Sequence, residues 1–117
     1  MWFKMPSSNA HFELTWEVTT SGETETNSTP IPSVIWRRWL VIVCRQGSGT
    51  ITVKGGVRIP EAPETVYWDT VASASVTPDS TTILDISDKF PYHHYKVDFT
   101  PSGGGPYSIF VRIEGNA

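Results

Sequence analysis

The sequence predicts an all-β protein: a single antiparallel β-sandwich or jelly-roll of about seven to eight strands, preceded by an extended N-terminal arm. Apolar residues alternate with polar ones along most of the chain, at the two-residue period of a strand. Five Trp, four Tyr and five Phe accompany abundant Thr, Ser and Val, a composition that favours strands over helices. The nine prolines fall between the alternating runs and mark connections.

A chain of 117 residues is long enough for one hydrophobic core and too short for two. We therefore expect one sandwich domain over residues 11–117 and an arm over residues 1–10. The arm carries Trp2, Phe3 and Met5, which are spaced too irregularly for a strand. Exposed apolar side chains favour aggregation, so the arm either folds back over its own sandwich or docks on a neighbouring chain. On the second interpretation, these three residues are anchors between subunits.

The first strand is expected over residues 11–19. Its apolar residues alternate with Glu and Thr, as in a strand with one buried face. They are Phe12, Leu14, Trp16 and Val18.

A polar loop over residues 20–33 follows and is longer than a hairpin needs. Loops of this length in a compact domain are usually functional or disordered. Within the loop, Ile31 lies between Pro30 and Pro32, on a stiff extended segment suited to filling a groove. We therefore count Ile31 as a fourth interface anchor.

The most hydrophobic run covers residues 34–45, and residues 40–44 within it do not alternate. Such a run is typical of a central strand covered on both faces. A helix fits less well, because β-branched residues dominate and glycines close the run at strand length. Trp36 and Trp39 flank two arginines. We expect the rings in the core and the arginine stems along apolar surface with their heads in water, with nucleobase or sugar stacking as the alternative.

Five further strands are expected at residues 49–58, 65–76, 81–86, 92–100 and 107–114. Three consecutive glycines, at positions 103 to 105, separate the last two runs and allow the backbone to reverse within a short loop. We predict that these two strands pair as an antiparallel hairpin around which the chain is organised.

Charge and cysteine content restrict the partners. The net charge is −3 with no clustered basic run, which argues against a free-standing nucleic-acid-binding protein. Cys44 lies in an apolar run and is expected to be buried, and one cysteine cannot form a disulfide within the chain. No apolar stretch reaches the length of a signal-peptide core or a membrane span, so we expect synthesis in a reducing cytoplasm and no membrane partner.

Catalytic patterns are sparse. His93 and His94 are adjacent in an expected strand, so their side chains point to opposite faces and cannot readily share one metal ion. No nucleophile motif, calcium loop or phosphate loop is present. We therefore expect no enzymatic activity, no cofactor and no metal. A convergence of His93 with Asp98 and Glu114 would revive the enzyme hypothesis.

Several segments between residues 40 and 115 follow one pattern. They are Gly49-Thr-Ile-Thr-Val-Lys-Gly55, Val66-Tyr-Trp68, Phe90-Pro-Tyr92 with Tyr95-Lys-Val-Asp-Phe99, Gly103-Gly-Gly, and Ser108-Ile-Phe-Val-Arg-Ile113. In this order they resemble the small β-sandwich structural proteins of tailed-bacteriophage virions. In those proteins, a Gly-Thr-Val-Thr-Val strand precedes a tryptophan strand, and an aromatic-led strand pairs with the last strand across a Gly-Gly turn. This chain lacks the usual Asp-Gly turn before the tryptophan segment.

The resemblance implies a structural role in a virion, which is made in the host cytoplasm. Within it, we expect a non-enzymatic capsid decoration (cement) protein that bridges major capsid subunits at the capsid surface. We expect copies to associate as a homo-oligomer, such as a trimer, without nucleic acid. The alternative is a carbohydrate-binding or tail and fibre module, in which exposed Trp36, Trp39 or Trp68 forms a platform for sugar.

Overall fold

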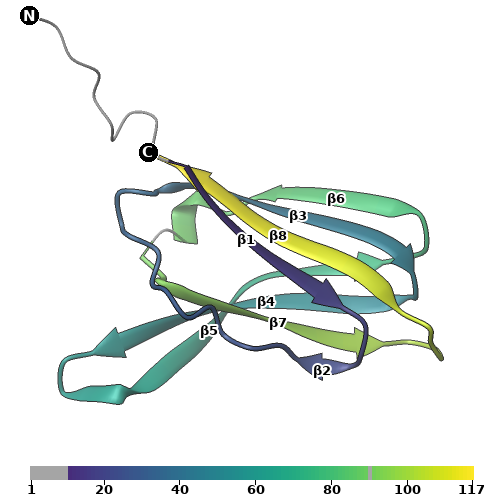
Figure 1. Cartoon of the computed structure of the whole chain (residues 1–117), viewed down its shortest axis with the longest axis horizontal. Helices are drawn as coiled ribbons and strands as arrows, with labels where there is room; N and C mark the ends of the chain where they lie inside the picture. Colours follow the sequence, from purple (N-terminus) through teal and green to yellow (C-terminus); the bar gives the residue numbers. More distant parts are fainter. Residues whose placement is uncertain (1–10, 90) are drawn as a thin grey trace, which may run out of the picture.

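The structure is a computed structural model that describes residues 11–89 and 91–117 (Figure 1). Its elements are β1 (His11–Val18), β2 (Gly22–Glu23), β3 (Arg37–Gln46), β4 (Gly49–Ile59), β5 (Ala62–Val76), β6 (Ser80–Asp85), the short 3₁₀ helix η2 (Ser87–Lys89), β7 (His94–Pro101) and β8 (Ser108–Asn116). In this part of the chain, no helix has the length and apolarity needed to cross a membrane.

The strands form two antiparallel four-stranded sheets (Figure 1). The first sheet has the order β1-β8-β3-β6 and the second the order β2-β7-β4-β5. Pairing is nested, because β1 pairs with β8, β2 with β7, β3 with β6 and β4 with β5. This is the strand order of a jelly-roll, and the predicted all-β sandwich is confirmed.

Each of the seven predicted strands is present, with ends displaced by no more than three residues. The alternating pattern was therefore a reliable guide to where strands begin and end. The eighth strand, β2, was missed because it has only two residues and lies within the polar loop.

The predicted hairpin between the last two strands is wrong. β7 pairs with β2 and β4 in the second sheet, whereas β8 pairs with β1 and β3 in the first. Residues 102–107 therefore carry the chain from one sheet to the other. Tyr107 in this connection packs edge-on against Phe99, with 5.1 Å between the ring centroids. Alternation and glycines indicate that the chain reverses, but they do not select the strand with which each run pairs.

The hydrophobic core lies between the inner faces of the two sheets. The first sheet contributes Leu40, Ile42, Ile109, Val111 and Ile113, and the second contributes Ile51, Val53, Tyr95, Val97 and Phe99. All ten side chains are at most 1% exposed. Three apolar side chains of β1 pack against this core while remaining half-buried.

Arg38 points into the sandwich and is 0% exposed, because it shares the inner face of β3. Its guanidinium donates hydrogen bonds to four oxygen atoms, the carbonyls of Pro32, Ile35 and Tyr92 and the hydroxyl of Tyr95. A buried charge is tolerated only when its hydrogen-bonding groups are satisfied in this way. The expectation that arginine heads reach water is therefore wrong for Arg38.

These bonds tie the segment that precedes β3 to the segment that precedes β7. Gly115 of β8 is opposite Arg38 in the register, and a Cβ at this position would lie 2.5 Å from Ile35 Cγ2. The close approach therefore requires glycine.

Burial raises the pKa of the Tyr95 hydroxyl, and the adjacent Arg38 guanidinium opposes this rise.

We predict that Arg38→Ala lowers the free energy of unfolding by about 3 kcal/mol or more, because buried oxygen acceptors lose their donor. Urea unfolding followed by tryptophan fluorescence measures this loss. Arg37→Ala is the matched control, because Arg37 is the exposed neighbour on the same strand. We expect the control to change the free energy by no more than about 0.5 kcal/mol. Equal effects of the two substitutions would contradict a structural role for the buried guanidinium.

We also predict that the thiol of Cys44 is unreactive in the folded protein. Cys44 is 1% exposed and its Sγ donates to the carbonyl of Gly47 at 3.2 Å. Burial raises the pKa of this thiol, which reduces the thiolate fraction available for reaction. A chromogenic disulfide reagent should label the chain in urea and leave it unlabelled in native buffer. Rapid labelling of the native protein would refute the burial.

Candidate interaction surface on the outer face of the first sheet

Strand β3 is apolar on both faces. Its inner residues belong to the core, and its outer face carries Trp39, Val41 and Val43, all half-buried. The sequence predicted that both faces of this run are covered. Within the described residues this prediction is wrong for the outer face, whose side chains remain partly accessible.

Neighbouring strands extend this apolar surface. Phe110 of β8 lies opposite Val43, and Ile83 of β6 lies opposite Val41. Ile83 is 65% exposed. We call Trp39, Val41, Val43, Ile83 and Phe110 the apolar band. It crosses three adjacent strands, and contiguous exposed apolar surface of this kind marks interaction sites.

Charged side chains surround the apolar band. Glu13 and Glu17 are exposed on β1, and Arg37 and Arg45 are exposed near the two ends of β3. Asp85 of β6 lies opposite Trp39. An apolar centre with a charged rim is the composition of a protein–protein interface.

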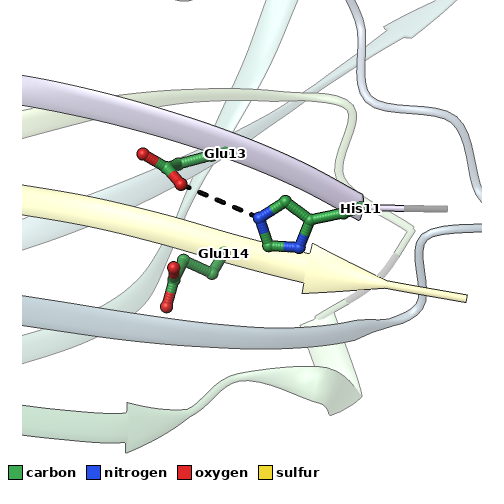
Figure 2. Close-up of side chains that lie close together, drawn as sticks. All are labelled: His11, Glu13 and Glu114. Atoms are coloured by element: carbon green, nitrogen blue, oxygen red, sulfur yellow. Dashed lines mark ion pairs between the residues drawn. The ribbon is translucent and has the colours of Figure 1, made fainter. Parts of the chain in front are cut away.

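At one corner of this rim, His11 and Glu13 of β1 approach Glu114 of β8 (Figure 2). His11 Nε2 lies 3.7 Å from Glu13 Oε2. Glu13 and Glu114 are directly opposite each other in the register, and like charges so placed repel. Arg112, on the same face of β8, lies 3.9 Å from Glu13 and 3.6 Å from Glu114 and offsets this repulsion.

The donor atoms of His11, Glu13 and Glu114 lie within 4.8 Å of one another. One imidazole nitrogen and two carboxylates are ligands that zinc accepts. However, the guanidinium of Arg112 already pairs with both carboxylates, and a metal ion here would compete with it. Arg112 Nε is buried without a hydrogen-bond partner, so its contact with Glu114 is electrostatic. We interpret the cluster as an ion-pair network at the rim of the apolar band.

We predict that Arg112→Ala lowers the free energy of unfolding by about 0.5–1 kcal/mol at low ionic strength, because Glu13 and Glu114 then face each other without a cation. Adding Glu114→Gln should recover most of this loss. Salt should weaken the effect, because partly exposed charges are screened. Urea unfolding of the single and double variants checks this prediction, and a double variant no more stable than the single variant would argue against it.

The cluster itself was missed from the sequence. His11 and Glu13 could have been noticed as neighbours on one strand face, because two-residue spacing places them there. Glu114 could not have been added, because only the pairing of β1 with β8 brings it opposite Glu13.

The predicted anchors have different outcomes. Trp2, Phe3 and Met5 lie outside the described residues. Ile31 is 1% exposed and belongs to the core, and its N–H donates to the carbonyl of His93 at 2.9 Å. The groove that Ile31 fills is in its own sandwich, which corrects the expectation that it contacts a neighbouring chain.

The tryptophan positions also differ from the prediction. Trp36 is 47% exposed, with the guanidinium of Arg37 5.2 Å from its ring centroid, and Trp39 belongs to the apolar band. Neither ring fills the core. Trp68 lies on the outer face of the second sheet, with Lys96 Nζ 4.3 Å from its ring centroid. Trp39 and Trp68 lie on opposite outer faces, so these two rings do not share one platform.

The residues considered for catalysis do not converge. Asp98 lies on β7 in the second sheet, whereas Glu114 lies on β8 in the first. His93 Nδ1 lies 2.9 Å from the carbonyl oxygen of Ile31, and His94 is buried. These side chains therefore do not share a site.

The outer face of the second sheet is polar by comparison. The hydroxyls of Thr52 and Ser73 lie 3.4 Å apart. Glu23 pairs with Lys54 and Lys96, each at 3.0 Å, and the hydrogen bonds from these two lysines lower the pKa of the Glu23 carboxyl. The two outer faces thus differ in chemistry, and the first sheet carries the candidate interaction surface.

Comparisons with known proteins do not assign this chain to a family. No family model matches the sequence, and no curated protein matches it. Among solved structures, a crystal structure of PirA is similar over 89% of this chain and 93% of its own, with 19% sequence identity and a TM-score of 0.43.

Two larger proteins are also similar. The cysteine peptidase Peruvianin-I from Thevetia peruviana latex is 13% identical with a TM-score of 0.38, over 92% of this chain and 52% of its own. Hydroxypropylphosphonic acid epoxidase from S. wedmorenis in complex with fosfomycin is 15% identical with a TM-score of 0.35, over 90% of this chain and 42% of its own. These likenesses are too weak to carry a functional argument, so we interpret the surface from its own geometry.

Proposed function

We propose that this protein is a non-enzymatic virion structural protein of the capsid decoration type, which attaches to major capsid subunits through the outer face of the first sheet. The observation that carries the proposal is the apolar band. Its side chains are partly accessible, and the run that forms its centre has the hydrophobicity of a strand covered on both faces.

The residue types of the apolar band suit a protein partner. Trp39 supplies an aromatic side chain, and buried aromatic residues contribute much of the binding energy at protein interfaces. Ile83 is 65% exposed, so a partner that covers it removes most of its side chain from water. Complete burial of such a side chain contributes about 1.5–3 kcal/mol.

The charged rim can orient the protein on its partner. Acidic residues gather on β1, and exposed arginines lie near the ends of β3. Complementary charges across an interface direct the encounter and fix its register more than they raise affinity. A surface with both signs at defined positions can therefore select one orientation on a partner.

A repeated partner would strengthen modest contacts. On a capsid lattice, identical sites lie at fixed spacings, and an oligomeric decoration protein meets several of them at once. Linked binding events act through high effective concentration, so each apolar band needs only moderate affinity. Jelly-rolls occur in viral capsid proteins and in lectins, so the fold itself is compatible with the proposal without selecting it.

We predict that Ile83→Lys leaves the chain folded and weakens its binding to virions from the same source at least about tenfold, because a charge then meets an apolar contact. Co-sedimentation with particles lacking the protein measures the affinity. Ser73→Lys is the matched control, because Ser73 is exposed on β5, the outermost strand of the other sheet. If folded Ile83→Lys binds as well as Ser73→Lys, the apolar band is not the attachment surface.

A further inference from the structure

A groove opens along one side of the sandwich. β1 is the outermost strand of the first sheet, and residues 25–29 run along the outermost side of the second. Between them lies a hollow of about 410 Å³ that is lined by residues 12–16 and 25–29. Its apolar lining consists of Phe12, Leu14 and Trp16, each half-buried.

Both walls of this groove are held in place. The indole N–H of Trp16 donates to the carbonyl of Glu25 at 3.1 Å, which links the walls at one point. Asn27 is fixed to β7, because its side-chain oxygen accepts a hydrogen bond from the Tyr95 N–H at 2.6 Å. The groove is therefore a formed feature of the fold, and a ligand need not order these walls first.

The backbone of β1 makes the groove suitable for an extended chain. Among the described strands, β1 pairs with β8 alone, so its other side is an open sheet edge. An extended segment can add to such an edge through main-chain hydrogen bonds, and its alternate side chains then enter the neighbouring hollow. An occupant with apolar side chains would bury Phe12, Leu14 and Trp16 further.

The charge of the lining narrows the choice of occupant. Glu13 and Glu25 are the charged residues of the lining, and both are acidic. A matching segment combines apolar side chains with at least one base. Residues 1–5 of this chain have this composition, with Lys4 among four apolar residues.

The chain length before β1 allows this segment to reach a groove on another copy. Residues 6–10 join this segment to His11, and five extended residues span roughly 17 Å. Pro6 disfavours the helical conformation at Met5 and so favours continuation in an extended direction. Exchange of an identical element between copies is a low-cost route to an oligomer.

We propose that residues 1–5 of a second copy of this chain lie in the groove as an added strand beside β1, so that neighbouring copies are joined by their arms. This inference rests on the proposed function, because it names the contact between copies in the assembly. It gives Phe3 and Met5, which share one face of an extended segment, an apolar site, and it places Trp2 and Lys4 on the opposite face, beside Glu13.

Disulfide trapping between differently substituted full-length chains tests the proposal. One variant carries Phe3→Cys and the other carries Ser28→Cys, which lies at the exposed wall of the groove. The native Cys44 is buried and should not compete. Mixed under mild oxidation, the two variants should form a heterodimer of twice the chain mass. Phe3→Cys mixed with Ser73→Cys is the control and should not crosslink above background.

Two results would overturn the inference. In a single chain that carries both Phe3→Cys and Ser28→Cys, a disulfide that forms only within a monomer would show that each arm fills its own groove. Absence of a crosslink in both the mixture and the doubly substituted chain would show that the groove does not receive the arm. In either case, particle binding that still depends on Ile83 would leave the proposed function intact. Failure of the arm-in-groove inference can therefore be distinguished from failure of the proposed function.

Discussion

The buried guanidinium of Arg38 holds together the two segments that lead into β3 of the first sheet and β7 of the second. A charge inside the sandwich must have its donors satisfied, and here the acceptors come from the segment before β3 and from the segment before β7. Those two segments are therefore held together at one end of the sandwich. Ile31 enters the core from the first of them. Arg38 thus fixes the end of the long polar loop through the Pro32 carbonyl, whereas hydrogen bonds at Glu25 and Asn27 fix its earlier part.

The same strand that carries Arg38 also explains the candidate function. A two-layer sandwich can cover only one face of each sheet, whereas β3 has apolar residues on both. The second sheet covers the inner face, and the outer face stays partly accessible. In the function that we propose, this excess hydrophobicity serves attachment to a partner. The outer face of the second sheet, with its lysine and glutamate pairs, is polar by comparison.

Two surfaces of the first sheet would have separate tasks in the assembly that we propose. The apolar band faces away from the sandwich and suits a flat protein surface, whereas the groove beside β1 suits an extended chain. Binding at the apolar band would depend mainly on the burial of side chains, whereas binding at the open edge of β1 would depend mainly on main-chain hydrogen bonds. A protein with both can attach to a lattice and connect its own copies without using the same residues twice.

The sequence by itself determined every strand except the two-residue β2, because side-chain alternation is a local property with a two-residue period. It also indicated that the run at residues 40–44 is apolar on both faces, although the structure covers only the inner one. Only the tertiary structure decided that the last two strands lie in different sheets, that Arg38 and Ile31 are buried, and that Glu114 faces Glu13. Strand partners are residues far apart in the chain, and one alternating strand fits many partners equally well until the whole core is packed.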